Sequence, residues 1–337
     1  MVLPGLRLSA GCRQTHIGRR QKETSGLLQK NPVILADQTA VPLRREILMN
    51  RQEFRMMTEN RILLLDGATG TEMMKRGMPR NTCAEAWILD HGDLLLDLER
   101  AYAQAGSQVV YAPTFSANRI SLKKHGLEKD VERLNTGLVE LTRKAVGQDV
   151  LVAGDMTTPG EPLDPLGDLQ EEELYEAYRE QAEALYQAGA DLIVAETLMA
   201  LREAELALQA VRSVCSLPFM ATMTVQEDGR AWFGGTAEEL MKKMAEQGAD
   251  AAGINCSSGP RQLEPVVRAM AVGAEIPVIV KPNAGLPVMV DGSAVYDMKP
   301  EDFVREMKKL VQDGASILGG CCGTTPEFIR MLRANLL

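Results

Sequence analysis

One pattern recurs along this chain and limits its possible folds more than any other feature. An amphipathic stretch ends at a Gly followed by a small residue, and a short apolar run begins within one or two positions. The pattern occurs at residues 105–107, 188–190, 247–249 and 313–315. Gly is favoured just past a helix end, where the backbone turns left-handed. Helix, Gly and short apolar strand in repetition predict βα units on a parallel sheet.

Filling the intervals gives eight candidate strands, with the clearest helices at 171–187 and 201–214. The strands are expected at 62–66, 108–111, 150–155, 191–196, 219–225, 249–255, 277–281 and 316–319. Eight βα units fit a (β/α)₈ (TIM) barrel, an α/β fold of typically about 250 residues. A doubly wound sheet is the alternative, although it would usually contain fewer strands. The pattern therefore predicts a barrel over residues 53–337.

Residues 1–48 have a different composition from the rest of the chain. They contain eight Lys or Arg against three Asp or Glu, and they show no sustained hydrophobic period. This composition predicts a basic, disordered N-terminal extension. The extension lacks the apolar segment of a secretory signal and superficially resembles a transit peptide. A translation start near Met49 is an equally good interpretation.

Charge and cysteine content exclude several classes of protein. The formal net charge of −9 argues against nucleic acid as a partner, because phosphate binding needs a basic face. No apolar run approaches the ~20 residues that a membrane span requires. Six Cys in 337 residues do not make a disulfide scaffold, which favours a reducing compartment. We therefore expect a cytoplasmic protein without a nucleic acid or membrane partner.

Polar residues follow most of the predicted strands. Each would lie at the carboxyl end of its strand, where barrels carry their active sites. They are Asp66, Asp155, Glu196, Asn255, Cys256, Lys281, Asn283, Cys321 and Cys322. A single polar residue at a strand end means little, because loops are polar anyway. Their number predicts one active-site rim.

The three Cys of this set predict a metal site. Cys321 and Cys322 are adjacent, and neighbouring Cα atoms about 3.8 Å apart are too close for an ordinary disulfide. With Cys256 they can offer three thiolates to one Zn²⁺, which leaves the fourth position open for chemistry. Such a site carries a net charge of about −1, which suits binding a substrate thiol and lowering its pKa. The alternative is three ordinary buried thiols.

The segment Asp66-Gly67-Ala68-Thr69-Gly70-Thr71 closes the first strand and opens a helix. It lacks a Lys and the GxGxxG spacing, so nucleotide binding is disfavoured, whereas a helix N-terminus suits a carboxylate. Asp66 and Glu196 can hold an ammonium group, unless both are merely capping acids. Together these features predict an amino-acid pocket beside a thiol-binding metal.

Three motifs carry a resemblance to a known family. Residues 319–327, 253–256 and 65–71 resemble the homocysteine S-methyltransferase family, and with 282–285 they look closest to the homocysteine-binding barrel of cobalamin-dependent methionine synthase. The resemblance implies that Cys256, Cys321 and Cys322 ligate zinc, through which they are catalytic. It also implies that Asp66 and Glu196 contact the homocysteine amine and that the turn at 67–70 contacts its carboxylate. The candidate substrate-binding residues are Asp66, Gly67, Ala68, Thr69, Gly70, Glu196 and Asn255.

The sequence departs from this family at two places. The related branch typically reads Thr-Asn-Thr-Phe after the second strand, where this chain has Ala112-Pro113-Thr114-Phe115. Pro113 removes a polar side chain and an N–H from the rim, so substrate contacts can differ there. No folate or cobalamin domain follows before Leu337. We therefore expect an external methyl donor, either methylcobalamin on a separate protein or S-methylmethionine, with betaine less favoured.

The predicted function is a zinc-dependent S-methyltransferase that activates homocysteine as a thiolate and methylates it to methionine. Two alternatives stay open. The same zinc barrel can be a corrinoid-protein methyltransferase component that acts on another methyl substrate. A non-enzymatic subunit with a structural zinc is also compatible, but it would need a fourth protein ligand, and the strand ends offer none.

Overall fold

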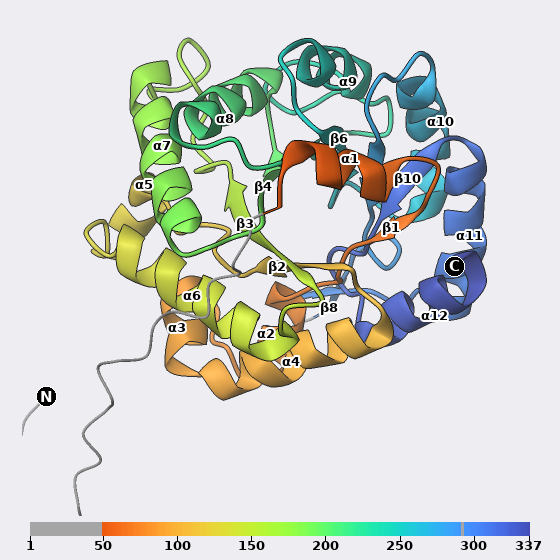
Figure 1. Cartoon of the computed structure of the whole chain (residues 1–337), viewed down its shortest axis with the longest axis horizontal. Coiled ribbons are helices and arrows are strands. Elements are labelled where there is room, and N and C mark those ends of the chain that lie inside the picture. Colours follow the sequence, from red (N-terminus) through yellow and green to blue (C-terminus); the bar gives the residue numbers. More distant parts are fainter. Residues whose placement is uncertain (1–48, 291–292) are drawn as a thin grey trace, which may run out of the picture. The chain divides into compact units, whose positions relative to one another are not determined.

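The structure is a computed structural model that describes residues 49–290 and 293–337. The predicted extension over 1–48 lies outside the described residues. In the described chain, eight parallel strands form a nearly closed barrel in the order β1-β10-β7-β6-β5-β4-β3-β2 (Figure 1). The strands are β1 (Leu63–Leu64), β2 (Val109–Ala112), β3 (Leu151–Thr157), β4 (Leu192–Leu198), β5 (Phe219–Met223), β6 (Ala251–Asn255), β7 (Val278–Lys281) and β10 (Ala315–Leu318).

All eight predicted strands are confirmed, and each observed strand overlaps the range expected from the sequence. The first and second strands of the chain stand at the two ends of the sheet order, and hydrogen bonds join them directly. A doubly wound sheet leaves its outer strands apart, so the alternative fold is wrong and the (β/α)₈ barrel is correct.

Helices surround the strands (Figure 1). The expected helices at 171–187 and 201–214 are found with the same boundaries, as α7 and α8. The helices are α1 (Arg51–Thr58), α2 (Gly70–Lys75), α3 (Ala84–Asp90), α4 (Gly92–Ala105), α5 (Arg119–Lys123), α6 (Val131–Val146), α7 (Glu171–Gln187), α8 (Leu201–Val214), α9 (Ala237–Glu246), α10 (Pro260–Ala271), α11 (Pro300–Gln312) and α12 (Pro326–Leu336). None of the helices in the described chain is long and apolar enough to cross a membrane.

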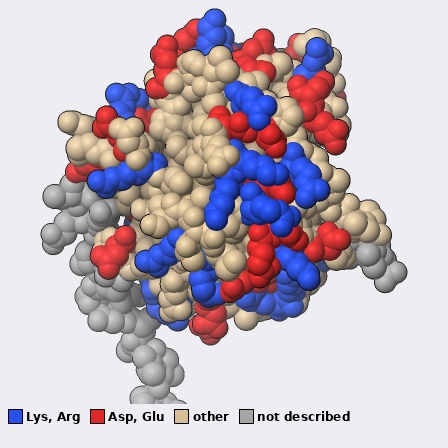
Figure 2. All heavy atoms as spheres, turned by 90° about the vertical axis from the view of Figure 1, so that its right-hand side faces the viewer, with Lys and Arg blue, Asp and Glu red and all other residues tan. Residues whose placement is uncertain are grey.

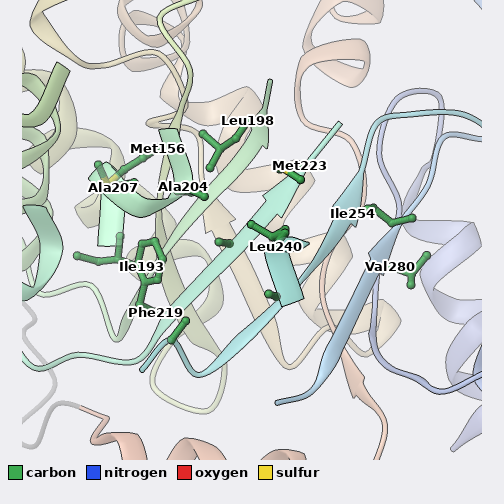
Figure 3. Close-up of a cluster of buried hydrophobic side chains, with 14 of the residues drawn as sticks. Met156, Ile193, Leu198, Ala204, Ala207, Phe219, Met223, Leu240, Ile254 and Val280 are labelled. Atoms are coloured by element: carbon green, nitrogen blue, oxygen red, sulfur yellow. The ribbon is translucent and has the colours of Figure 1, made fainter. Parts of the chain in front are cut away.

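The apolar core has an inner and an outer part, because successive strand residues point to opposite faces. Leu63 and Leu65 belong to the cluster inside the barrel, whereas Leu64 between them packs in the cluster between strands and helices. Figure 3 shows part of that outer cluster. Phe54 of α1 is fully buried in the inner cluster, so α1 covers one end of the barrel.

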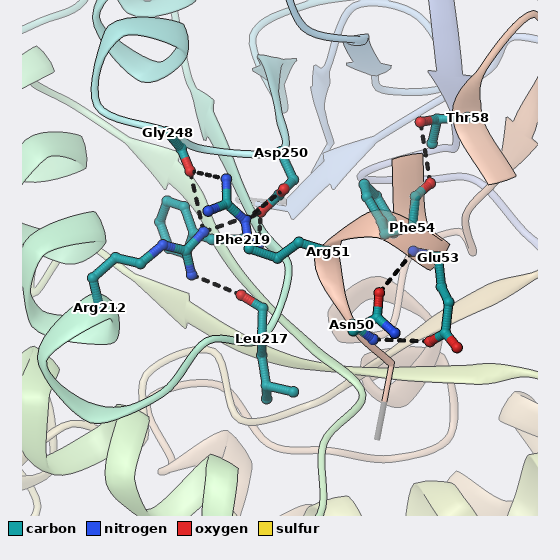
Figure 4. A network of polar contacts seen from close by, with 10 residues as sticks. All are labelled: Asn50, Arg51, Glu53, Phe54, Thr58, Arg212, Leu217, Phe219, Gly248 and Asp250. Atoms are coloured by element: carbon teal, nitrogen blue, oxygen red, sulfur yellow. Dashed lines mark hydrogen bonds and ion pairs between the residues drawn. The ribbon is translucent and has the colours of Figure 1, made fainter. Parts of the chain in front are cut away.

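That end is the amino end of the strands, and a polar network holds α1 to it (Figure 4). Asp250, just before β6, accepts hydrogen bonds from Arg51 Nε at 2.9 and 3.1 Å, from Arg212 Nη2 at 3.0 Å and from the Phe219 N–H at 3.0 Å. The Asp250 side chain has no exposed area, so it is a buried acid with every oxygen partnered.

One backbone hydrogen bond and two bonds to side chains close the junction between β1 and β2. The Gln108 N–H donates to the Leu64 carbonyl at 2.8 Å, and the Gln108 side-chain oxygen accepts from the Leu64 N–H at 3.1 Å. At the other end of the junction, the Tyr111 N–H donates to Asp66 Oδ2 at 2.7 Å. A carboxylate therefore takes the place of a backbone acceptor where the barrel closes.

One element was not anticipated from the sequence. Residues after β7 form an antiparallel hairpin of β8 (Val288–Val290) and β9 (Ser293–Val295). The hairpin leads to Tyr296 and Met298, and the Met298 N–H donates to the Ala284 carbonyl at 3.2 Å. The excursion therefore returns the chain to the carboxyl rim before α11 begins.

The described outer surface carries both signs of charge. Figure 2 shows the face formed by the right-hand side of Figure 1, where Lys and Arg side chains lie next to Asp and Glu side chains. Ion pairs also occur at α10 and α11: Arg268 of α10 pairs with Asp313 just after α11 at 3.0 Å, and Lys309 pairs with Glu306 within α11 at 2.6 Å.

Candidate active site

Three Cys side chains converge at the carboxyl end of the barrel. Cys256 follows β6, and Cys321 with Cys322 follows β10, while β7 lies between these two strands. Their sulfurs lie within 4.8 Å of one another, and Cys256 Sγ is 3.7 Å from Cys322 Sγ. Tetrahedral Zn²⁺ with Zn–S bonds of about 2.3 Å needs sulfurs about 3.8 Å apart. The three thiols therefore fit a zinc ion in both type and spacing.

The backbone aims these sulfurs from both sides of β7. Cys256 has a φ of +53°, a conformation that costs a non-Gly residue about 1–3 kcal/mol and therefore needs support. Its carbonyl accepts from the Asn283 side-chain amide at 3.1 Å, and its N–H donates to the Lys281 carbonyl at 3.2 Å. Opposite, the Cys321 N–H donates to the Pro282 carbonyl at 2.7 Å. The segment after β7 thus braces both halves of the cluster.

The loop that carries the Cys pair is tied down on its other side as well. Thr324 Oγ1 donates to the Cys321 carbonyl at 2.7 Å, and the Ala284 N–H donates to the Cys322 carbonyl at 2.9 Å. Gly323 has a φ of +82°, and a Cβ there would lie 2.4 Å from Tyr296 Cβ. Gly is therefore required at 323 both by conformation and by space.

The thiols also interact with one another. Hydrogen bonds from Cys256 and Cys321 lower the pKa of the Cys322 thiol to about 3. Hydrogen bonds with Cys256 and Cys322, and then burial, raise the pKa of Cys321 well above its usual range. Of these two thiols Cys322 therefore loses its proton more readily, and a thiolate is the form that binds a soft metal.

Three buried acids and one buried Lys lie beside the cluster. Asp66, Asp155 and Glu196 come from the ends of β1, β3 and β4, and Lys281 reaches them from the end of β7. Lys281 Nζ is 3.1 Å from Asp66 Oδ1, 3.6 Å from Glu196 Oε2 and 4.0 Å from the centre of the Tyr111 ring. The strand-end acids that the sequence predicted are brought together, and a protein cation lies between two of them.

Burial and charge shift the pKa values of these groups. Burial acts to lower the pKa of Lys281, but Asp66 and Glu196 outweigh it and raise that pKa well above its ordinary value. Burial, reinforced by the nearby charge of Glu196, raises the pKa of Asp155 well above its usual range. The pocket therefore holds Lys281 as an ammonium group and favours the neutral form of Asp155.

Asn255, a predicted substrate-binding residue, bonds to side chains and backbone of the neighbouring strands β4 and β5. Its side chain is fully buried, and Oδ1 accepts from the Thr197 N–H at 2.8 Å and from Thr222 Oγ1 at 2.9 Å, while Nδ2 donates to Thr197 Oγ1 at 2.7 Å. Thr197 follows Glu196 and has a φ of +58°. Asn255 thus holds the backbone next to Glu196, and it is not among the residues that line the cavity.

The turn at Gly67–Gly70 is fastened to the Cys loop. The Ala68 N–H donates to Thr324 Oγ1 at 3.1 Å, and the Gly323 N–H donates to Thr71 Oγ1 at 3.2 Å. A Cβ at residue 67 would lie 2.7 Å from the Tyr102 hydroxyl oxygen, so Gly is needed at this position too. Hydrogen bonds therefore join two motifs whose bonded residues are 256 and 252 positions apart in the sequence.

A cavity of about 620 Å³ joins all these groups. Its wall includes the three clustered Cys, the acids Asp66, Asp155 and Glu196, Lys281, and the turn from Gly67 to Gly70. From the strand ends the cavity extends to apolar side chains of α2, α3 and α5, namely Met74, Ile88 and Leu122. Pro113 also lines it, so the departure from the family pattern faces this space.

Some residues of the site carried no readable signal in the sequence. Tyr296 lies against Gly323 beyond an unanticipated hairpin, and the helix residues of the cavity wall look like ordinary core positions. Lys281 and Asn283 could be placed at a strand end. Their partners could not be named, because those partners come from other strands.

Comparison with known proteins bears on this arrangement. The model of the family described as homocysteine S-methyltransferase matches residues 63–336. Among curated proteins, methionine synthase of Mycobacterium leprae is 28% identical over 298 residues, and methionine synthase of Mycobacterium tuberculosis is 29% identical over 292 residues. Each alignment covers 81% of this chain and 24% of the relative, so the chain spans about a quarter of their length.

Solved structures agree with the sequence comparisons. The homocysteine methyltransferase MmuM from Escherichia coli, in an oxidized form, is 25% identical with a TM-score of 0.69, and the match covers 81% of this chain and 95% of that chain. A metallated form of the same protein gives a TM-score of 0.68 with 25% identity, covering 82% of this chain and 96% of that chain.

Proposed function

Because the chain belongs to the homocysteine S-methyltransferase family, we propose that it is a zinc-dependent enzyme that methylates the thiol of homocysteine to give methionine. The observation that carries the proposal is the convergence of three Cys thiols on one wall of a cavity that also contains buried carboxylates. When bound, Zn²⁺ supplies a Lewis acid that lowers the pKa of a coordinated substrate thiol, so that a thiolate is available near neutral pH.

The residues of the chain have separate tasks in this proposal. Cys256, Cys321 and Cys322 hold the ion and, as thiolates, give the centre a charge of about −1. Glu196 offers a carboxylate to the substrate ammonium, and the turn at Gly67–Gly70 receives the substrate carboxylate. These contacts place the substrate sulfur in one orientation towards the donor, and such positioning contributes much of the rate enhancement in group transfer.

The methyl donor enters from the side of the cavity that α2, α3 and α5 line. The candidates are methylcobalamin carried by a separate protein and S-methylmethionine. The side chains of Met74, Ile88 and Leu122 make part of that wall apolar, which suits either donor.

A subunit with a purely structural zinc is the non-enzymatic alternative. Structural zinc sites are closed by four protein ligands. Over residues 49–290 and 293–337, no fourth His, Cys, Asp or Glu joins the three thiols. An open coordination position beside a cavity favours a site that binds a substrate.

Elemental analysis combined with a binding titration tests the proposal. We expect one zinc per chain, and we expect L-homocysteine to release a proton when it binds near neutral pH, because its thiol is deprotonated on the metal. Reduced protein without zinc would overturn the proposed mechanism. Zinc-loaded protein that does not bind homocysteine would overturn the proposed substrate.

A further inference from the structure

The ammonium group of Lys281 lies where the sequence predicted the ammonium of the substrate. Lys281 starts at the end of β7, and its side chain crosses the inside of the barrel to Asp66 on one side and Glu196 on the other. The side chain is 5% exposed, so these contacts are shielded from water. A buried cation that already serves both acids changes what the pocket needs from a ligand.

The two acids are not equally committed to Lys281. Asp66 is 1% exposed, with Oδ2 bonded to the Tyr111 N–H at 2.7 Å and Oδ1 at 3.1 Å from Lys281 Nζ. Glu196 is 10% exposed, and its approach to Lys281 is longer, at 3.6 Å. Asp66 Oδ1 and Glu196 Oε2 are both buried without a hydrogen bond to a described residue. The shorter approach of Lys281 and the Tyr111 N–H bond nevertheless commit Asp66 more strongly, so Glu196 keeps the greater capacity to bind a second ammonium group.

We infer that Lys281 is a specificity-determining residue, which neutralises Asp66 from within the protein and leaves Glu196 alone to bind the substrate ammonium. This inference rests on the proposed function, because it concerns the thiol that the same site takes. Its consequence is a pocket that also accepts thiol acids without an amino group. Without Lys281, two buried carboxylates would both require a cation from the ligand; with Lys281, a thiol acid that lacks the amine leaves Glu196 alone unpaired.

The size of the expected discrimination follows from this difference. A site whose buried polar groups all depend on one substrate group rejects the analogue lacking that group by about 10⁴-fold or more. A site in which a protein group already pairs with one of the buried acids loses less affinity when the ligand lacks that group. We therefore expect the native pocket to prefer L-homocysteine over 4-sulfanylbutanoate, the same thiol acid without the amine, by less than about 100-fold.

The chain offers a matched control. Lys124 lines the same cavity, but its Nζ is bonded to the Pro159 carbonyl at 2.8 Å and paired with Glu161 at 3.0 Å. Its charge is therefore used outside the strand-end acids. Lys124→Met removes a cation from the cavity wall without touching Asp66 or Glu196.

The experiment is isothermal titration calorimetry of zinc-loaded protein with each of the two thiols at one pH. We expect Lys281→Met to raise the affinity ratio of homocysteine to 4-sulfanylbutanoate about tenfold or more. Lys281→Arg, which keeps the charge, should stay within about threefold of the native ratio, and Lys124→Met should not change it. A structural role alone would weaken both thiols equally and leave the ratio unchanged.

The outcomes separate this inference from the proposed function. Native protein that binds neither thiol would overturn the proposed function and the inference with it. Native protein that binds homocysteine, with the same ratio in Lys281→Met, would overturn the inference alone. If Lys281→Met does not fold, Glu196→Gln decides the question. The ratio should then fall to about one, and an unchanged ratio would show that Glu196 is not the acceptor of the amine.

Discussion

Buried acids at the two ends of the barrel differ in how many hydrogen-bond partners they have. At the amino end, Asp250 accepts hydrogen bonds from two guanidinium groups and a backbone N–H, so its charge is fully compensated (Figure 4). At the carboxyl end, Asp155 Oδ1 and Glu196 Oε2 are buried without a hydrogen bond to any described residue. A buried polar group without a partner costs about 1–3 kcal/mol.

This difference separates stability from binding. An acid whose oxygens are all paired stabilises the structure and has no free oxygen for a ligand. Asp250 is such an acid, because its pairs join α1, α8 and the start of β6. The acids at the other end lower the stability of the unliganded protein, and a ligand that satisfies them recovers that free energy as affinity. The same residue type at the same degree of burial thus serves two purposes, and the number of partners tells them apart.

The largest expected effect comes from removing a thiol at the carboxyl end. Cys256→Ala or Cys321→Ala should abolish zinc binding and lower activity more than about 100-fold, because residues that merely support a metal ligand already cost 10–100-fold. The thermal midpoint should change by only a few degrees, since neither thiol packs in a core cluster. Elemental analysis, an activity assay and a thermal melt measure the three quantities.

The control for this prediction is Cys215→Ala. Cys215 follows α8, lies away from the cavity and should keep both zinc and activity. Full zinc retention and activity in the Cys256 or Cys321 variant would contradict the three-thiolate site.

The next effect belongs to the amino end and concerns stability alone. Asp250→Asn should lower the free energy of unfolding by about 2–4 kcal/mol, because Arg51 and Arg212 lose their counter-charge. This value is low for the loss of one partner of a buried ion pair, because the Arg51 side chain is 34% exposed. Urea denaturation measures the loss. The kinetic constants of the folded enzyme should not change, and a changed KM would break the proposed division between the two ends.

An exposed acid provides the comparison for Asp250→Asn. Asp302 pairs with Arg305 at 2.7 Å, and its side chain is 45% exposed. Asp302→Asn should cost less than about 0.5 kcal/mol, because solvent screens such pairs.

Among the buried acids, the smaller effect comes from the same Asp-to-Asn change at the carboxyl end. Asp155→Asn should alter the free energy of unfolding by less than about 1 kcal/mol below about pH 4, where the folded and the unfolded native protein both hold the proton on this acid. Asn is close to the protonated acid in shape and has no charge. Urea denaturation at several pH values is the measurement.

The difference in stability between the native protein and the Asp155→Asn variant should change with pH in a definite direction. Burial raises the pKa of Asp155 in the folded protein. Below its unfolded pKa of about 3.9, both states hold the proton. As the pH rises towards the folded pKa, the unfolded chain releases the proton and the folded protein keeps it, so stability falls. The Asp155→Asn variant should therefore gain on the native protein as the pH rises. Parallel curves would contradict the shift.

The fold could be predicted because its signals are local. At four places a helix ends near a Gly and a buried strand begins within a few residues, and the intervals between these places fixed the other four strands. The β8–β9 hairpin was missed for a physical reason. Val288 and Met289 are apolar residues like those of the core, yet they are 52% and 66% exposed.

The site was only partly readable from the sequence. The three Cys and the acids could be placed on one rim, because carboxyl ends of parallel strands meet. The contacts that decide their roles join distant strands. Lys281 spans the barrel from β7 to β1 and β4, and Asn255 turns to Thr197 instead of the cavity. Such choices depend on side-chain reach and on neighbouring loops, which spacing in the sequence does not encode.

The seam between β1 and β2 has a consequence for how the protein fluctuates. Seven strand junctions are closed by backbone ladders, whereas here the Tyr111 amide is held by the carboxylate of Asp66. That carboxylate also lines the cavity, where Lys281 approaches its other oxygen at 3.1 Å, so one amide of the barrel wall depends on the charge state of the site. The exchange rate of the Tyr111 amide proton should therefore rise when Lys281 is replaced by Met, because the carboxylate that accepts from this amide loses its counter-charge.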